Sequence, residues 1–222
     1  MMSDLILFHF PAACSRVTMS ALEEIGLPFE ARCVNFRKGA QCSPEYLALN
    51  PKAKVPALSI GGRVMTENAA ILAFLNRQYP DAGLLPHDDD PVLDNQGPTD
   101  LVWCSSTLHP MVRQIRMPMK WTVGDSEGVA GVKADGLKKF AQECHGIAAR
   151  VANGWWYRSG WSIVDVYLYW AYSTAAKGGF PLGDYSALLD HAARVRARPS
   201  FQRVLARERA AVEAEGIADV EL

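Results

Sequence analysis

The chain has 222 residues, 49% of them apolar, and a formal net charge of -1. That length can build one core of ordinary size or two small ones. The near-zero charge gives no broad electrostatic reason to expect nucleic acid or an anionic membrane as a partner. The first apolar run, from Leu5 to Phe10, is short and has no basic residue before it. We therefore expect neither a signal peptide nor a membrane span, and a cytoplasmic location.

The cysteines and acidic residues show no pattern of a metal site. The five cysteines are an odd number, without a Cys-x-x-Cys pair or a zinc-type Cys/His spacing. This usage favours free thiols in a reducing compartment and predicts no metal. The acidic run from Asp88 to Asp90 is interpreted as solvated charge in a linker, because it lies among turn residues.

Strands and helices alternate along roughly the first eighty residues. The pattern predicts a strand from Leu5 to Phe10, a helix from Ser15 to Ile25 that ends at Gly26, and a second strand from Phe29 to Phe36. The remaining predicted elements are a short helix after Ser43-Pro44, strands at Ala57 to Ile60 and Arg63 to Met65, and a helix from Glu67 to Gln78. This βαβ-α-ββα order indicates a thioredoxin-like domain.

The rest of the chain is predicted to be helical. We expect a thioredoxin-like α/β domain at 1–80, a turn-rich linker at 81–90 and an all-α domain at 91–222. Ser162 and Asp165 have the spacing of a helix-capping box, whose role is structural. An arginine series near the end, from Arg194 to Arg209, is interpreted as the solvated face of the last helices.

Two short segments together predict a site for an extended peptide. Val55-Pro56 stands where a strand begins, and a cis bond there would turn the main-chain groups of Val55 outward to a ligand. Glu67-Asn68 opens a helix whose free N–H groups favour an anion, while the Glu67 carboxylate suits an ammonium. One peptide ligand carrying both charges would satisfy both groups.

These segments resemble the glutathione-binding half of the cytosolic glutathione transferases, in which a Val-Pro pair and a Glu-Ser pair hold the tripeptide. The resemblance extends from Leu5 to about Glu208 and is nearest to the bacterial beta class. It implies the two-domain glutathione transferase fold, with glutathione as co-substrate. Asn68 departs from the family's serine, and we expect weaker or re-angled glutathione binding, because an amide still binds a carboxylate.

The turn from Phe10 to Arg16 is the expected catalytic centre. Its Ala13-Cys14-Ser15 is similar to the beta-class turn that supplies a cysteine. A thiol has a pKa of about 8.5, and lowering it by two units needs roughly 2.7 kcal/mol. A helix N-terminus together with one hydrogen bond supplies that much. Ser15 could donate to the glutathione sulfur, and Cys14 could form a mixed disulfide. The alternative is that Cys14 is a buried structural thiol and Ser15 a simple cap.

Other candidate residues follow from the resemblance. Lys38 and Lys54 could meet the glycine carboxylate of glutathione, although a solvated charge is the alternative for Lys38. His109 stands where the beta class has a histidine that reaches glutathione, and a satisfied surface or core histidine is its alternative. An apolar pocket for the acceptor substrate is expected from these side chains: Phe10, Pro11, Met111 and Ile115.

The predicted activity is attack of a glutathione thiolate on an electrophilic, mostly apolar or aromatic substrate, in detoxification or degradation of aromatic compounds. Three alternatives stay open. The segment from Gly178 to Phe180 resembles glutathione-dependent β-aryl etherases. Cys14 could serve a glutathione-dependent disulfide reductase, and the change to Asn68 allows a non-catalytic glutathione-binding protein. The resemblance implies a homodimer, with a heterodimer as the alternative, and no nucleic-acid or membrane partner.

Overall fold

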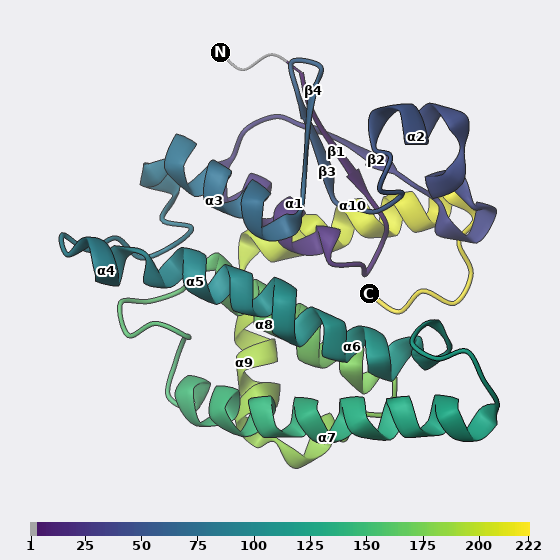
Figure 1. Cartoon of the computed structure of the whole chain (residues 1–222). Coiled ribbons are helices and arrows are strands. Elements are labelled where there is room, and N and C mark those ends of the chain that lie inside the picture. Colours follow the sequence, from purple (N-terminus) through teal and green to yellow (C-terminus); the bar gives the residue numbers. More distant parts are fainter. Residues whose placement is uncertain (1–3) are drawn as a thin grey trace. The chain divides into compact units, whose positions relative to one another are not determined.

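The computed structural model describes residues 4–222, which form two compact units (Figure 1). The first unit contains Met1–Leu84 together with Ala197–Leu222, and the second contains Leu85–Arg196. The sequence predicted that residues 197–222 belong to the helical domain. The structure groups it with the α/β unit, because the last helix packs against the first one.

The first unit has the thioredoxin-like arrangement that the sequence predicted. Its sheet has the strand order β2-β1-β3-β4. Strand β1 pairs parallel with β2 and antiparallel with β3, and β3 pairs antiparallel with β4. The elements of this unit are β1 (Leu5–His9), α1 (Ser15–Ile25), β2 (Glu30–Cys33), α2 (Pro44–Leu49), β3 (Ala57–Ile60), β4 (Arg63–Thr66), α3 (Asn68–Gln78) and α10 (Pro199–Glu215).

Alternate side chains along β1 pack on opposite faces of the sheet. Ile6, Phe8 and Phe10 contribute to a cluster that includes Tyr46 of α2. Since side chains alternate along a strand, Leu7 and His9 project from the opposite face. Both are buried there, where α1 packs on β1 and in turn contacts α3 and α10.

The arginines of α10 attach this last helix to α1. Arg203 and Arg207 both donate to the carboxylate of Glu23, and Arg198 donates to Glu24 at 2.8 Å. The interpretation of these arginines as a solvated face holds in part, because Arg203 and Arg207 stay 52% and 39% exposed, but it missed their ion pairs with α1. Their periodicity is that of a surface helix, but their carboxylate partners lie in a segment distant in the sequence.

The second unit is entirely helical within residues 85–196. Its longest helix, α7, is preceded by Asp125, whose side chain accepts the Gly128 N–H at 3.0 Å. The elements are α4 (Pro91–Asp94), α5 (Gln96–Trp103), η4 (Cys104–Leu108), α6 (His109–Arg116), α7 (Ser126–Val151), α8 (Ile163–Ala176) and α9 (Ser186–Ala197).

The buried start of α8 is a polar centre of this unit. The predicted capping box is confirmed, and the Ser162 N–H donates to Asp165 at 2.8 Å. The Asp165 carboxylate also accepts the Trp156 N–H at 2.7 Å and lies 2.9 Å from Nε2 of His191. Asp165 and His191 are fully buried, so these contacts compensate the carboxylate for its lost hydration.

A widened turn accommodates a proline between α5 and α6. Pro110 has no N–H, and in an α-helix its ring would clash with the carbonyl of Ser106. The chain instead forms a π-helix at Cys104–Leu108, closed by the His109 N–H donating to the Cys104 carbonyl. The sequence did not predict this turn, since hydrophobic periodicity does not distinguish a π-turn from an α-helix.

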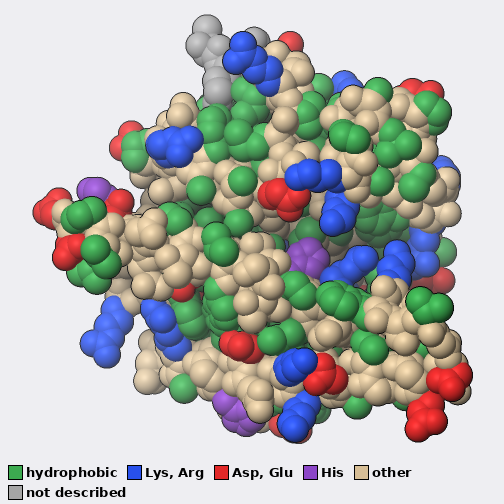
Figure 2. Space-filling model, in the orientation of Figure 1, with side chains coloured by type: hydrophobic (Ala, Val, Ile, Leu, Met, Phe, Trp, Pro, Cys, Tyr) green, Lys and Arg blue, Asp and Glu red, His purple; other side chains and the backbone are tan. Residues whose placement is uncertain are grey.

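Surface and composition agree with the near-zero charge. On the face shown in Figure 2, basic and acidic side chains are both present and neither sign covers the whole face. Among the described helices, none is long and apolar enough to cross a membrane. Residues 4–222 contain no group of three or more His, Cys, Asp or Glu side chains arranged to hold a metal ion.

His9 makes the stability of the first unit dependent on pH. Burial, assisted by the positive charge of Arg207, lowers the pKa of His9 from 6.5 to about 4, and its Nδ1 has no hydrogen-bond partner among the described residues. The unfolded chain therefore binds a proton that the folded chain excludes. Above pH 6.5, His9 is neutral in both states and does not lower stability. As the pH falls from 6.5 to 4, we expect the free energy of unfolding to decrease by about 3 kcal/mol.

The measurement is urea unfolding at several pH values between 7 and 4 for the wild type and for His9→Gln. The difference between the two proteins isolates His9 from the other titrating groups. A wild-type pH dependence that persists unchanged in His9→Gln would contradict the assignment.

Candidate functional site

The turn between β1 and α1 is closed by Ser15. The Phe10 N–H donates to Ser15 Oγ at 3.2 Å, and this hydroxyl donates to the Phe10 carbonyl at 3.3 Å. Ser15 is fully buried. Of the two predicted donors of Ser15 to a ligand sulfur, the hydroxyl is directed to the backbone in the structure, and the N–H is left for that role. Cys14 occupies the N-cap position, and its side chain caps nothing.

Cys14 brings the two predicted halves of the site together. Its Sγ donates to the main-chain carbonyl of Val55 at 3.5 Å. The Val55-Pro56 bond is cis, as predicted, and the Val55 N–H has no hydrogen-bond partner among residues 4–222. Tyr46 and Asn50 fix this segment by donating to the Lys54 carbonyl at 2.6 and 2.8 Å.

The start of α3 forms the second half. Its first backbone hydrogen bond runs from the Ile71 N–H to the Glu67 carbonyl at 2.9 Å. The N–H groups of residues 68, 69 and 70 therefore lie outside the helical ladder, at the positive end of the helix. Glu67 has a φ of 70°, and its exposed carboxylate accepts from Lys52 Nζ at 2.7 Å. An ammonium thus already occupies the position predicted to attract one.

The Asn68 side chain has a different role from the expected one. It is only 6% exposed, and its amide nitrogen donates to the Cys14 carbonyl at 2.9 Å. Its amide oxygen accepts from the Thr18 hydroxyl at 2.6 Å. This amide therefore points inward to α1 instead of toward a ligand carboxylate. Thr18 was not predicted as part of the site, because its contact with Asn68 depends on how α1 packs against α3.

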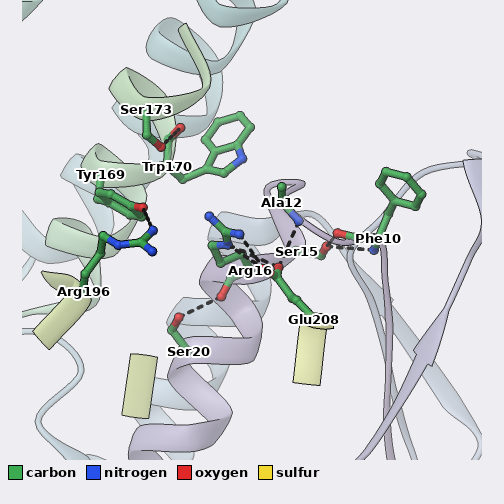
Figure 3. Close-up of polar contacts among 10 residues, drawn as sticks. All are labelled: Phe10, Ala12, Ser15, Arg16, Ser20, Tyr169, Trp170, Ser173, Arg196 and Glu208. Atoms are coloured by element: carbon green, nitrogen blue, oxygen red, sulfur yellow. Dashed lines mark hydrogen bonds and ion pairs between the residues drawn. The ribbon is translucent and has the colours of Figure 1, made fainter. Parts of the chain in front are cut away.

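A buried ion pair holds the turn from behind (Figure 3). Arg16 Nε donates to both carboxylate oxygens of Glu208, at 3.2 and 3.1 Å. The same carboxylate accepts the N–H of Ala12 at 3.1 Å, and Ala12 has a φ of 60°. Arg16 and Glu208 are 3% and 0% exposed. The last helix of the chain thereby fixes the backbone two residues before Cys14.

Comparisons with known proteins agree with this geometry. Residues 12–78 match the glutathione S-transferase N-terminal domain. A glutathione transferase homologue from Sulfitobacter, solved with bound glutathione, superposes with a TM-score of 0.78 and 26% identity over 97% of this chain and 100% of that one. The chain belongs to the glutathione transferase superfamily.

Curated relatives within this superfamily align over part of their length. A zeta-class glutathione S-transferase from Euphorbia esula is 37% identical over 103 residues, which are 46% of this chain and 45% of that protein. A maleylpyruvate isomerase from a Ralstonia species is 34% identical over 48% of this chain and 50% of that enzyme. The chain thus matches about half the length of these relatives.

Lys38 and Lys54, which the resemblance predicts to contact the glycine carboxylate of glutathione, differ in their contacts. Lys38 Nζ donates to Glu215 at 3.1 Å, and Asn35 donates to the same carboxylate. The hydrogen bond from Asn35, and to a smaller extent the one from Lys38, lowers the pKa of Glu215 from its usual value. The Lys54 side chain is exposed beside the cis bond. Lys54 therefore keeps the freedom to meet a ligand, whereas Lys38 would have to leave an ion pair.

The apolar candidates divide between the two units. In the first, Phe10 stacks on Phe36 with ring centroids 4.8 Å apart, and Pro11 is buried. In the second, the ring of His109 meets Trp170 edge-on at 4.6 Å, and Met111 is half-buried at the start of α6.

Ile115 belongs to the core of the helical unit, contrary to its prediction as a pocket residue. It is 2% exposed, and a Cβ on Gly178 would stand 2.6 Å from its Cγ2. Gly179 has a φ of 101°, and Phe180 packs edge-on against Phe140. The packing and backbone conformation of residues 178–180 therefore explain the Gly-Gly-Phe segment. This segment is then no longer specific evidence for an etherase.

The buried pair generates a prediction on stability. Glu208→Ala leaves the Arg16 guanidinium buried without its carboxylate, so we expect a loss of about 3 to 5 kcal/mol in the free energy of unfolding. Asp135→Ala, which removes the exposed partner of Lys139, should cost less than about 1 kcal/mol. Denaturant unfolding of both variants is the measurement. Equal, small losses would show that the turn does not depend on the buried pair.

Proposed function

We propose that the chain is a glutathione transferase that binds glutathione on its first unit and directs the glutathione thiolate at an electrophilic, mostly apolar or aromatic substrate. The observation that carries the proposal is the contact between Cys14 Sγ and the Val55 carbonyl, beside a Val55 N–H that has no partner among residues 4–222. An extended peptide that pairs with the Val55 main chain would bring its own sulfur next to the start of α1.

The charges at the start of α3 suit the other end of that peptide. Glutathione carries an ammonium and a carboxylate on its γ-glutamyl residue. The Glu67 carboxylate fits the ammonium, and the first N–H groups of α3 fit the carboxylate. The residues present therefore fit glutathione, with main-chain donors replacing the family's serine hydroxyl. Lys54 and Lys38 remain the candidates for the glycine carboxylate, and the role of His109 in glutathione binding remains a prediction from the resemblance.

Stabilisation of the thiolate then rests on α1 itself. The Ser15 hydroxyl donates to the Phe10 carbonyl, but the Ser15 N–H has no hydrogen-bond partner among the described residues. A helix N-terminus favours an anion by about 0.3 to 1 kcal/mol, up to ~2 when partly buried, and a hydrogen bond to a charged group by about 1.5 to 3. Together these cover the roughly 2.7 kcal/mol for two pKa units. The thiolate sulfur then bonds to the electrophilic carbon as the leaving group departs with its electron pair.

A second candidate is glutathione-dependent isomerisation. It is favoured by relatives that bear the names maleylpyruvate isomerase and maleylacetoacetate isomerase. Such a reaction uses the same thiolate, which adds to the substrate and leaves again, so the glutathione site would be unchanged. A dimer, with identical subunits, is the assembly that we infer from the family.

The experiment that tests the proposal has two stages. Retention on immobilised glutathione, with elution by free glutathione, tests binding. Turnover is then measured with an aryl halide, an aryl ether, a mixed disulfide of glutathione, and the two substrates named by the isomerase relatives. Retention without any turnover would indicate a binding protein. Absence of retention and of turnover would overturn the proposal.

Opposite effects are expected from the two members of the surface ion pair. Glu67→Ala removes the partner of the ligand ammonium and should weaken glutathione binding at least tenfold, which corresponds to about 1.4 kcal/mol. Lys52→Ala removes the internal competitor of that ammonium and should strengthen binding by up to about fivefold, since an exposed pair is worth about 0 to 1 kcal/mol. Titration calorimetry measures both. An unchanged dissociation constant in Glu67→Ala would remove this anchor from the site.

The reactive turn gives a prediction that separates its two side chains. Ser15→Ala breaks the contacts that close the turn, so it should lower stability by about 1 kcal/mol and leave the apparent pKa of the pH–rate profile near its wild-type position. Cys14→Ala removes the thiol that contacts the Val55 carbonyl, so it should abolish any glutathione-dependent disulfide reduction. Disulfide reduction retained in Cys14→Ala, or an apparent pKa that rises in Ser15→Ala, would contradict these two roles.

A further inference from the structure

We propose that Asn68 is a positioning residue for Cys14. Its amide ties the turn that carries the thiol to the first residue of the helix that anchors the ligand. The inference rests on the proposed function for the role of Cys14, although the contacts themselves do not depend on it. Asn68 is thereby more than a weakened version of the family's serine.

The orientation of the amide is determined by its two partners. The Cys14 carbonyl can only accept a hydrogen bond, so it must face the amide nitrogen, at 2.9 Å. The oxygen is then directed to Thr18, whose hydroxyl donates at 2.6 Å. A serine has one short polar atom and cannot reach both partners. The site is 6% exposed, so loss of the amide would leave two buried polar groups without a partner.

The segments that the amide joins are both held in unusual backbone conformations. Ala12, two residues before Cys14, has a φ of 60°, and Glu67, next to Asn68, has a φ of 70°. A left-handed conformation costs a non-glycine residue of order 1 kcal/mol or more and persists only where neighbours fix it. Glu208 supports Ala12 from one side. The Asn68 amide joins the turn to the start of α3, where Glu67 stands.

The Asn68 amide supports Cys14 through its main-chain carbonyl, in addition to the contacts of the thiol itself. The thiol caps nothing in α1, and its contact with the Val55 carbonyl is a weak hydrogen bond at 3.5 Å. Nearby charges are paired: Arg16 with Glu208 at the turn, and Lys52 with Glu67 at the start of α3. A neutral substitution of Asn68 changes none of these charges. A shift in the thiol pKa would then report the position of the sulfur relative to the start of α1.

The test compares the wild type, Asn68→Ala and Thr18→Val. Thr18→Val is the matched control, since it removes the hydrogen bond to the Asn68 amide oxygen and leaves the one from the amide nitrogen to Cys14. Each protein is treated with iodoacetamide across pH 5 to 10, and mass spectrometry follows alkylation of every cysteine. The exposed Cys42 in the same sample serves as the internal reference. Asn68→Ser replaces Asn68→Ala if the latter does not fold.

In Asn68→Ala the midpoint of the Cys14 profile should rise by about one unit, as the sulfur leaves the positive end of α1. Thr18→Val should leave that midpoint within about 0.3 unit, although both variants lose stability. With glutathione and a substrate that turns over, Asn68→Ala should lower kcat about tenfold and change KM for glutathione less than about threefold.

A Cys14 profile that is the same in all three proteins would overturn the proposal and leave Asn68 a structural residue. An equal shift of the Cys14 midpoint in Asn68→Ala and in Thr18→Val would also overturn the proposal. Since alkylation needs no glutathione, these outcomes are distinct from failure of the proposed function, which would appear as absence of glutathione binding in the wild type.

Discussion

The ion pair between Arg16 and Glu208 is the interaction on which the first unit depends. It joins the first and last helices of that unit in a site that water does not reach. A guanidinium buried in this way is tolerated only with its carboxylate, and the carboxylate also takes the N–H of Ala12. One pair of charges therefore fixes both the packing of α10 and the backbone that leads to Cys14.

Main-chain groups do most of the recognition that we propose. The Val55 N–H, the Ser15 N–H and the first N–H groups of α3 are donors whose positions follow from the fold. Side chains such as Asn68 and Ser15 hold the backbone in place instead of facing a ligand. Such a site tolerates replacement of the family's serine, because a main-chain donor does not change with the side chain.

The sequence predicted the elements of the first unit well, since Gly26, Ser43-Pro44 and the cis Val55-Pro56 bond are local signals. It also predicted that Cys14 and Val55 belong to one site, by resemblance. It did not predict the inward amide of Asn68, the partners of the α10 arginines or the core position of Ile115. Each of these depends on which residues meet across long separations in the chain, and periodicity carries no information on that. The candidate site was thus predictable in outline, and its supporting contacts were not.

The long sequence separation between Arg16 and Glu208 has a consequence for biosynthesis. A ribosome releases residues 85–196 before it releases α10, so the helical unit can fold while the first unit still lacks its last helix. Until Glu208 emerges, Arg16 has no buried partner and the Ala12 N–H has no acceptor. Val55 and Asn68 can contact Cys14 earlier in synthesis, but the backbone at Ala12 gains its support from Glu208 only after α10 has been synthesised.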